Sequence, residues 1–75
     1  MMSESEVVTE IVELAAPWGR RIKLSEIAYE SGLKMMRLRI REGTRFTMVE
    51  LDAPTATALG AALLAWVKKN DAAPH

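Results

Sequence analysis

Hydrophobic and basic side chains alternate along residues 33–51, which read LKMMRLRIREGTRFTMVEL. Because successive side chains of a β-strand point to opposite faces, this alternation predicts two strands of a half-buried hairpin. In the first strand, the inner face is expected to carry Met36, Leu38 and Ile40, and the outer face Arg37, Arg39 and Arg41.

The turn of this hairpin is expected at Glu42-Gly43-Thr44, because three-residue loops that contain a glycine are common between antiparallel strands. Such a loop pairs Arg41 with Arg45. It also places Phe46 and Met48 on the inner, apolar face, whereas a slip of one residue would mix apolar and basic side chains.

Residues 7–15 fit two interpretations, an amphipathic helix or a strand with alternating side chains. We favour a strand, because Pro17-Trp18-Gly19 is a turn signal and an extended pattern follows it in residues 20–30. Pairing these two strands sets Glu13 opposite Lys23, which is a favourable cross-strand pair.

The apolar positions of residues 20–30 change from even to odd numbers near Ser25-Glu26. This change of phase predicts a β-bulge in the second strand. Ser31-Gly32 is then expected to form a two-residue turn that pairs Ile27 with Met36.

A helix is expected after Asp52-Ala53-Pro54, since aspartate caps free N–H groups and proline is tolerated in the first turn. Its core stripe is Ala56, Leu59, Leu63, Trp66 and Val67. The elements predict one α+β domain over residues 1–75, a four-stranded antiparallel meander followed by one C-terminal helix packed on one sheet face (ββββα). We expect an ordered core at about residues 8–70 and flexible tails at 1–6 and 71–75.

The far side of this helix is also apolar, and a helix that is apolar nearly all round is buried on more than one side. We therefore expect a homodimer whose interface is formed by Ala58, Ala61, Leu64 and Ala65. The alternative is that alanines are good helix formers and are tolerated on surfaces.

Charge divides the chain into an acidic beginning and a basic middle. Residues 1–15 carry four glutamates and no base, whereas residues 16–45 carry eight Lys/Arg against three Glu. The basic residues fall on the outer sheet face, where like charges opposite each other are destabilising and need an offset. A bound polyanion would offset this repulsion, and single-stranded nucleic acid is the ligand we consider first. The alternative is a solvated face relieved by Glu13 and by salt.

The candidate nucleic-acid-binding residues are Arg21, Lys23, Arg37, Arg39, Arg41, Arg45 and Trp18. Trp18 is included because it lies in a turn, where an exposed ring can stack on a base. Tyr29 and Phe46 are expected to face the core in the predicted register.

The sequence offers few residues that would support catalysis, metal binding or a membrane span. There is no cysteine, and the one histidine is His75 at the end of the chain, so no catalytic residues, metal site or cofactor are predicted. The longest nearly apolar run, residues 56–67, is too short to span a bilayer. No basic segment followed by an apolar one opens the chain, so we expect a cytoplasmic, bacterial-type protein that is not an enzyme.

The order of the expected elements over residues 10–69, with Thr47-Met48-Val49-Glu50-Leu51-Asp52 leading into the helix, resembles the transcriptional-coactivator family called positive cofactor four. That resemblance implies a dimer that binds single-stranded DNA. The chain also looks like short bacterial proteins of unknown function, in which the turns at 17–19 and 30–33 and the strand at 45–47 recur together. The function predicted is a non-specific single-stranded nucleic-acid-binding dimer; the alternative is a protein-interaction module or a structural dimer.

Overall fold

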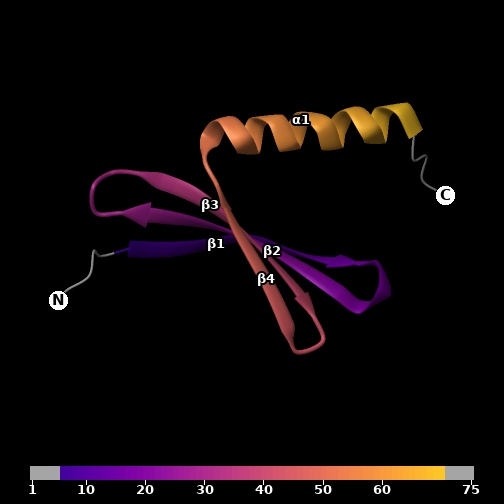
Figure 1. The fold of residues 1–75 in the computed structure, drawn as a ribbon, viewed down its shortest axis with the longest axis horizontal. Helices are drawn as coiled ribbons and strands as arrows, with labels where there is room; N and C mark the ends of the chain where they lie inside the picture. The colour runs from indigo at the N-terminus through magenta and orange to yellow at the C-terminus, as the bar shows by residue number, and fades with distance from the viewer. Residues whose placement is uncertain (1–5, 71–75) are drawn as a thin grey trace.

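The computed structural model describes residues 6–70, which form one antiparallel sheet followed by one helix (Figure 1). The strands lie in the order β1-β2-β3-β4, so the predicted ββββα meander is confirmed, including a strand for residues 7–15. The elements are β1 (Glu6–Ala16), the short 3-10 turn η1 (Pro17–Gly19), β2 (Arg20–Tyr29), β3 (Lys34–Glu42), β4 (Arg45–Leu51) and α1 (Ala53–Asn70). Glu6 begins β1, and the rest of the two predicted tails lies outside the described residues.

The β1–β2 hairpin has the predicted register near its turn, with Glu13 opposite Lys23. The turn itself is η1, as the Pro-Trp-Gly sequence indicates. Farther from the turn, β1 contains a bulge, because the register shifts between Glu10 and Val12. The bulge changes which side chains of β1 share a face, since residues before and after it differ in phase.

The prediction of a bulge at Ser25-Glu26 in β2 is wrong, because β2 pairs with β3 without a register shift. The extra residue lies instead in the turn. The Tyr29 N–H donates to the Leu33 carbonyl oxygen, so three residues, Glu30-Ser31-Gly32, lie between this pair in place of the predicted two. The glycine of this turn adopts a φ of 100°, a conformation that L residues with a Cβ rarely adopt. Ile27 therefore pairs with Met35 and not with Met36.

The predicted register of the β3–β4 hairpin is also wrong, by one residue. The loop is the two-residue Gly43-Thr44, whose glycine has a φ of 62° at the first position, as a type II′ turn requires. Glu42 therefore pairs with Arg45, and Arg41 pairs with Phe46. This register replaces a repulsive Arg41–Arg45 pair by an attractive one, which is the physical reason to prefer it.

The sheet has two distinct faces as a result of these registers. The apolar face carries Ile22, Leu24, Leu38, Ile40, Thr47 and Val49 across β2, β3 and β4. The basic face carries Arg21, Lys23, Arg37, Arg39 and Arg41, together with Phe46 and Met48. The ring of Phe46 therefore lies among the arginines, in contrast to the core position predicted for it.

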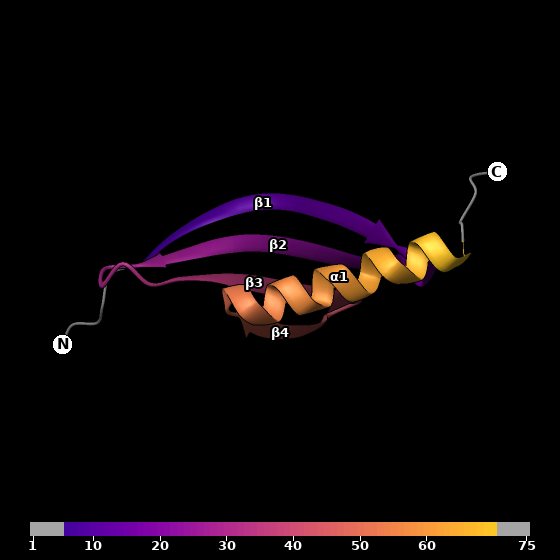
Figure 2. The same ribbon diagram turned by 90° about the horizontal axis from the view of Figure 1, so that it is seen from above.

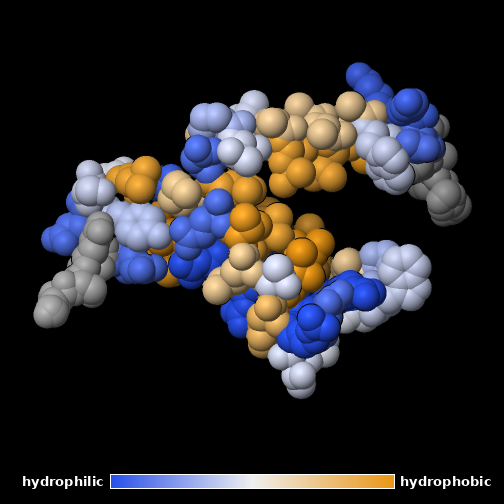
Figure 3. Space-filling view, in the orientation of Figure 1, coloured by the Kyte–Doolittle hydropathy of each residue, from blue (hydrophilic) through white to orange (hydrophobic). Residues whose placement is uncertain are grey.

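The helix begins as predicted, because the Thr55 N–H donates a hydrogen bond of 2.9 Å to the Asp52 side-chain oxygen Oδ1. The helix packs on one sheet face through its first turns and not along its whole apolar stripe. Only Ala56 and Gly60 are partly covered in α1, and all its other residues are exposed. The helix lies over the β3–β4 side of the sheet (Figure 2) but leaves the sheet after its first turns (Figure 1). The opening between the two has apolar side chains on both walls (Figure 3).

Candidate nucleic-acid interface

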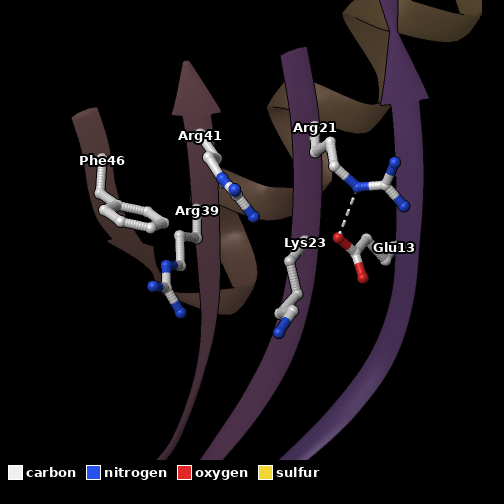
Figure 4. A pocket seen from close by; sticks show the side chains of 6 residues that line it. All are labelled: Glu13, Arg21, Lys23, Arg39, Arg41 and Phe46. Atoms are coloured by element: carbon white, nitrogen blue, oxygen red, sulfur yellow. Dashed lines mark hydrogen bonds and ion pairs between the residues drawn. The ribbon is translucent and has the colours of Figure 1, made fainter. Parts of the chain in front are cut away.

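A shallow hollow on the basic face is lined by side chains from all four strands (Figure 4). We call it the basic pocket; it is lined by Glu13 from β1, Arg21 and Lys23 from β2, Arg39 and Arg41 from β3, and Phe46 from β4. Four cations and one carboxylate give it a formal charge of +3. Its volume of about 110 Å³ is well below the roughly 300–1,000 Å³ typical of small-molecule sites, so it suits one group of a larger ligand.

Phe46 is the aromatic side of the basic pocket. The guanidinium carbon of Arg39 lies 4.2 Å from the centre of its ring, and that of Arg41 lies 6.0 Å away. Arg39 is therefore within the range of a cation–π interaction, which contributes roughly 0.5–1 kcal/mol at an exposed site. Phe46 is 52% exposed, so much of the ring remains open to solvent.

Two of the pocket cations are balanced by carboxylates of β1. The Arg21 Nε–H donates to Glu13 Oε2 at 2.8 Å, and the Lys23 Nζ lies 3.8 Å from Glu10 Oε1. The hydrogen bond from Arg21 lowers the pKa of the Glu13 carboxyl, with further lowering by the charge of Arg21. These pairs offset the repulsion that results from placing Arg21 opposite Arg41.

Arg39 and Arg41 are the pocket cations left without a carboxylate. Within residues 6–70, neither forms an ion pair, and Arg41 instead donates from Nε to the Gly43 carbonyl oxygen at 3.2 Å. They lie side by side with Phe46 on the half of the pocket farthest from β1 (Figure 4). This half can accept an anion without first breaking an ion pair.

Arg37, also predicted to bind nucleic acid, is held by acidic neighbours. Its Nη2 lies 2.8 Å from Glu50 Oε2 and 3.8 Å from Glu6 Oε1, and the Tyr29 hydroxyl donates to Glu50 at 3.1 Å. The hydrogen bond from Arg37 lowers the pKa of Glu50, and burial together with Glu50 raises the pKa of Tyr29. Tyr29 was predicted to face the core, but this contact places it on the basic face.

Two other predicted site residues lie away from the basic pocket. Arg45 pairs with Glu42, and the alternation along β4 places both on the apolar face of the sheet. Trp18 is 86% exposed in η1, at the β1–β2 turn, and does not line the pocket. The structure thus brings together Arg21, Lys23, Arg39 and Arg41 and separates them from Arg45 and Trp18.

Phe46 is the pocket residue that the sequence analysis missed. The sequence pattern placed it on the apolar face, because both sets of alternate positions in β4 contain apolar residues and the loop before β4 was predicted one residue too long. The charges provide the missing signal: only the observed register sets Glu42 opposite Arg45 and Glu50 opposite Arg37. The predicted dimer residues Ala58, Ala61, Leu64 and Ala65 are all exposed on α1.

Two further features were considered in the described part of the chain, a metal site and a membrane-spanning helix. Residues 6–70 contain no group of three or more side chains placed to hold a metal ion, and His75 lies outside them. No helix among these residues is long and apolar enough to cross a membrane.

A family of proteins of unknown function, DUF6967, matches residues 5–69. The chain belongs to this family. The match covers all four strands and nearly all of α1, so the DUF6967 domain and the ββββα fold coincide. No curated protein and no solved structure gives a significant match to the chain.

Proposed function

We propose that the basic pocket binds single-stranded nucleic acid without sequence preference, and that the protein has a binding and not a catalytic role. One observation carries this proposal: the exposed ring of Phe46 lies beside two arginines that have no carboxylate partner among residues 6–70. Single-strand binding proteins combine these same two groups, cations for the phosphates and aromatic rings for the bases.

In this proposal Arg39 and Arg41 hold a phosphate while a base stacks on Phe46. Arg39 lies over the ring at 4.2 Å, which leaves the opposite face of the ring for a base. A phosphate and its own base are separated by one sugar, so a single nucleotide can span from the arginines to the ring. The hydrogen-bonding edges of the base are not needed, which is why no sequence preference is expected.

Arg21 and Lys23 have a weaker role, because a phosphate must compete with Glu13 and Glu10 for them. The salt dependence of binding measures how many cations take part, since each phosphate contact contributes about −0.7 to the slope of log K against log salt for a single strand. Two contacts give a slope of about −1.4, and four give about −2.8. We expect a slope near the smaller value.

The experiment is a fluorescence anisotropy titration of a labelled oligothymidylate with protein up to about 100 μM, at about 50 mM salt. The wild-type chain is expected to bind in the micromolar range or more weakly. The variant Arg39→Gln/Arg41→Gln should lose binding, because it removes both unpaired cations.

The matched control is Lys68→Gln/Lys69→Gln, which removes two charges from the end of α1, far along the chain from the pocket. It should bind as the wild type does. Equal losses in both variants would mean that overall charge, and not the basic pocket, holds the oligonucleotide. No anisotropy change for the wild type at about 50 mM salt would rule out the proposal.

A further inference from the structure

Residues 6–70 of a single copy bury almost no hydrophobic core. Among residues 6–70 only Ile27 and Ser25 are buried, and Ile27 is the one apolar side chain with no exposed surface. The central residues of the apolar face, Ile22, Leu24, Leu38 and Ile40, are only half-buried, although central positions of a covered sheet are normally buried. The apolar face is therefore partly open to solvent, although its composition is that of a face packed against another apolar surface.

The opening between α1 and the apolar face has two apolar walls (Figure 3). We call it the slot. On the helix side, Leu59 and Val67 remain 39% and 45% exposed although they belong to the stripe that was expected to pack on the sheet. On the sheet side, the ion pairs Arg20–Glu42 and Lys34–Glu26 lie toward opposite ends of β3, so the region between them is free of charge.

The size of the uncovered surface fits a dimer interface. The chain exposes 6038 Å², whereas a compact monomer of 8.3 kDa is expected to expose about 4,600 Å². Half of the difference alone is roughly 700 Å², close to the ~800 Å² that each partner contributes to a standard interface. The radius of gyration of 15.0 Å, against about 11 Å for a compact chain of this length, agrees with an open shape.

We propose that the slot of each copy is filled by α1 of a second copy, so that two chains interlock about a two-fold axis. The missing cover must present an apolar surface, and α1 presents one. Its 18 residues are about 27 Å long, which matches the roughly 30 Å of the nine-residue strand β3 that it would cover. A two-fold arrangement also forms a closed dimer, because each copy inserts its α1 into the slot of the partner and holds the partner's α1 in its own slot.

The interlocked arrangement explains why α1 is apolar on both sides. The side that faces its own sheet, with Leu63 and Val67, meets the same side of the partner's α1. The opposite side, with Ala58, Ala61 and Ala65, meets the apolar face of the partner, where small residues allow close approach. Lys68 and Lys69 remain in the last turn of the helix.

The first test compares two variants with the same substitution at equal exposure. Leu63 in the slot is 57% exposed in one copy, and Leu33 in the β2–β3 loop is 55% exposed. Sedimentation at about 100 μM should give twice the mass of 8.3 kDa for the wild type and for Leu33→Glu, and a single mass for Leu63→Glu. A monomeric wild type, or a dimer that tolerates Leu63→Glu, would overturn the proposal.

The midpoint of thermal unfolding of the wild type tests the proposal without any variant, so it does not matter whether the variants fold. The wild-type midpoint should rise with protein concentration, because folding and association are linked in a dimer without a monomeric core. A midpoint that is constant over a hundredfold range of concentration would contradict the proposal even if Leu63→Glu is unfolded.

The second test asks whether the helix lies on the sheet of the other copy. The described chain has no cysteine, so single-cysteine variants can be mixed. Ala61→Cys mixed with Thr47→Cys, on the apolar face, should give a heterodimer with a short bismaleimide. Ala61→Cys mixed with Met48→Cys, one residue away on the basic face, should not. A dimer that gives no Ala61–Thr47 adduct associates in another way and refutes the interlocked arrangement.

Discussion

Replacing Phe46 by alanine tests whether its ring stacks on a base. Stacking of a base on an aromatic side chain contributes about 1–3 kcal/mol by alanine substitution. Phe46 is 52% exposed and Arg39 lies over it at 4.2 Å, so one face of the ring is available and the lower part of this range applies. We expect a loss of about 1–1.5 kcal/mol, which is a five- to twelvefold increase in the dissociation constant.

The assay is the anisotropy titration at about 50 mM salt, with two controls. Phe46→Leu keeps an apolar side chain at the position but removes the aromatic ring, so it should weaken binding nearly as much as alanine. Trp18→Ala removes an exposed aromatic ring that lies outside the pocket and should leave binding unchanged. If Phe46→Leu binds as tightly as the wild type, the ring does not stack and the reasoning fails.

Three further predictions concern charge and stability. Glu13→Gln should tighten oligonucleotide binding about five- to tenfold at about 50 mM salt, because it frees one more cation for a phosphate; anisotropy measures this gain. Arginine hydrogen bonds lower the pKa values of Glu13, Glu42 and Glu50 below the ordinary 4.5, so these pairs stabilise the folded state above that pH and lose their effect as the pH falls through the lowered values. Denaturant unfolding should therefore show a constant free energy of unfolding between about pH 7 and 5 and a decrease below about 4.5, with a smaller decrease for Glu50→Gln. Asp52→Ala should lower the free energy of unfolding by about 1 kcal/mol through loss of the helix cap, whereas Asp52→Asn should retain most of it.

The hairpin loops show where sequence patterns stop being informative. Alternation predicted all four strands and the pairing of Leu24 with Leu38, because one face of each strand is apolar. It placed the extra residue of β2 in the strand, as a bulge, whereas that residue lies in the loop. The loop takes it at lower cost, since the glycine of Glu30-Ser31-Gly32 adopts a positive φ without disturbing the ladder of hydrogen bonds.

The helix shows a second limit. Its capping residue, its length and its apolar stripe follow from local rules, and Asp52 caps it as expected. A periodic pattern shows that a helix must pack on something apolar, but it does not say whether that surface belongs to the same chain. The exposure of Leu59 and Leu63 in a single copy depends on the tertiary structure and does not follow from the local pattern.

The length of the β3–β4 loop determines which side chains line the basic pocket and which ones face the slot. A three-residue loop at Gly43 would move Phe46 and Met48 to the apolar face and Val49 to the basic face, because side chains alternate along β4. The basic pocket would then lose its ring, and Glu50 would no longer lie beside Arg37. The two-residue loop keeps Val49 on the apolar face beneath the slot and leaves the ring among the arginines. Because the two surfaces occupy opposite faces of one sheet, a partner helix in the slot leaves the basic pocket open to a nucleic-acid strand.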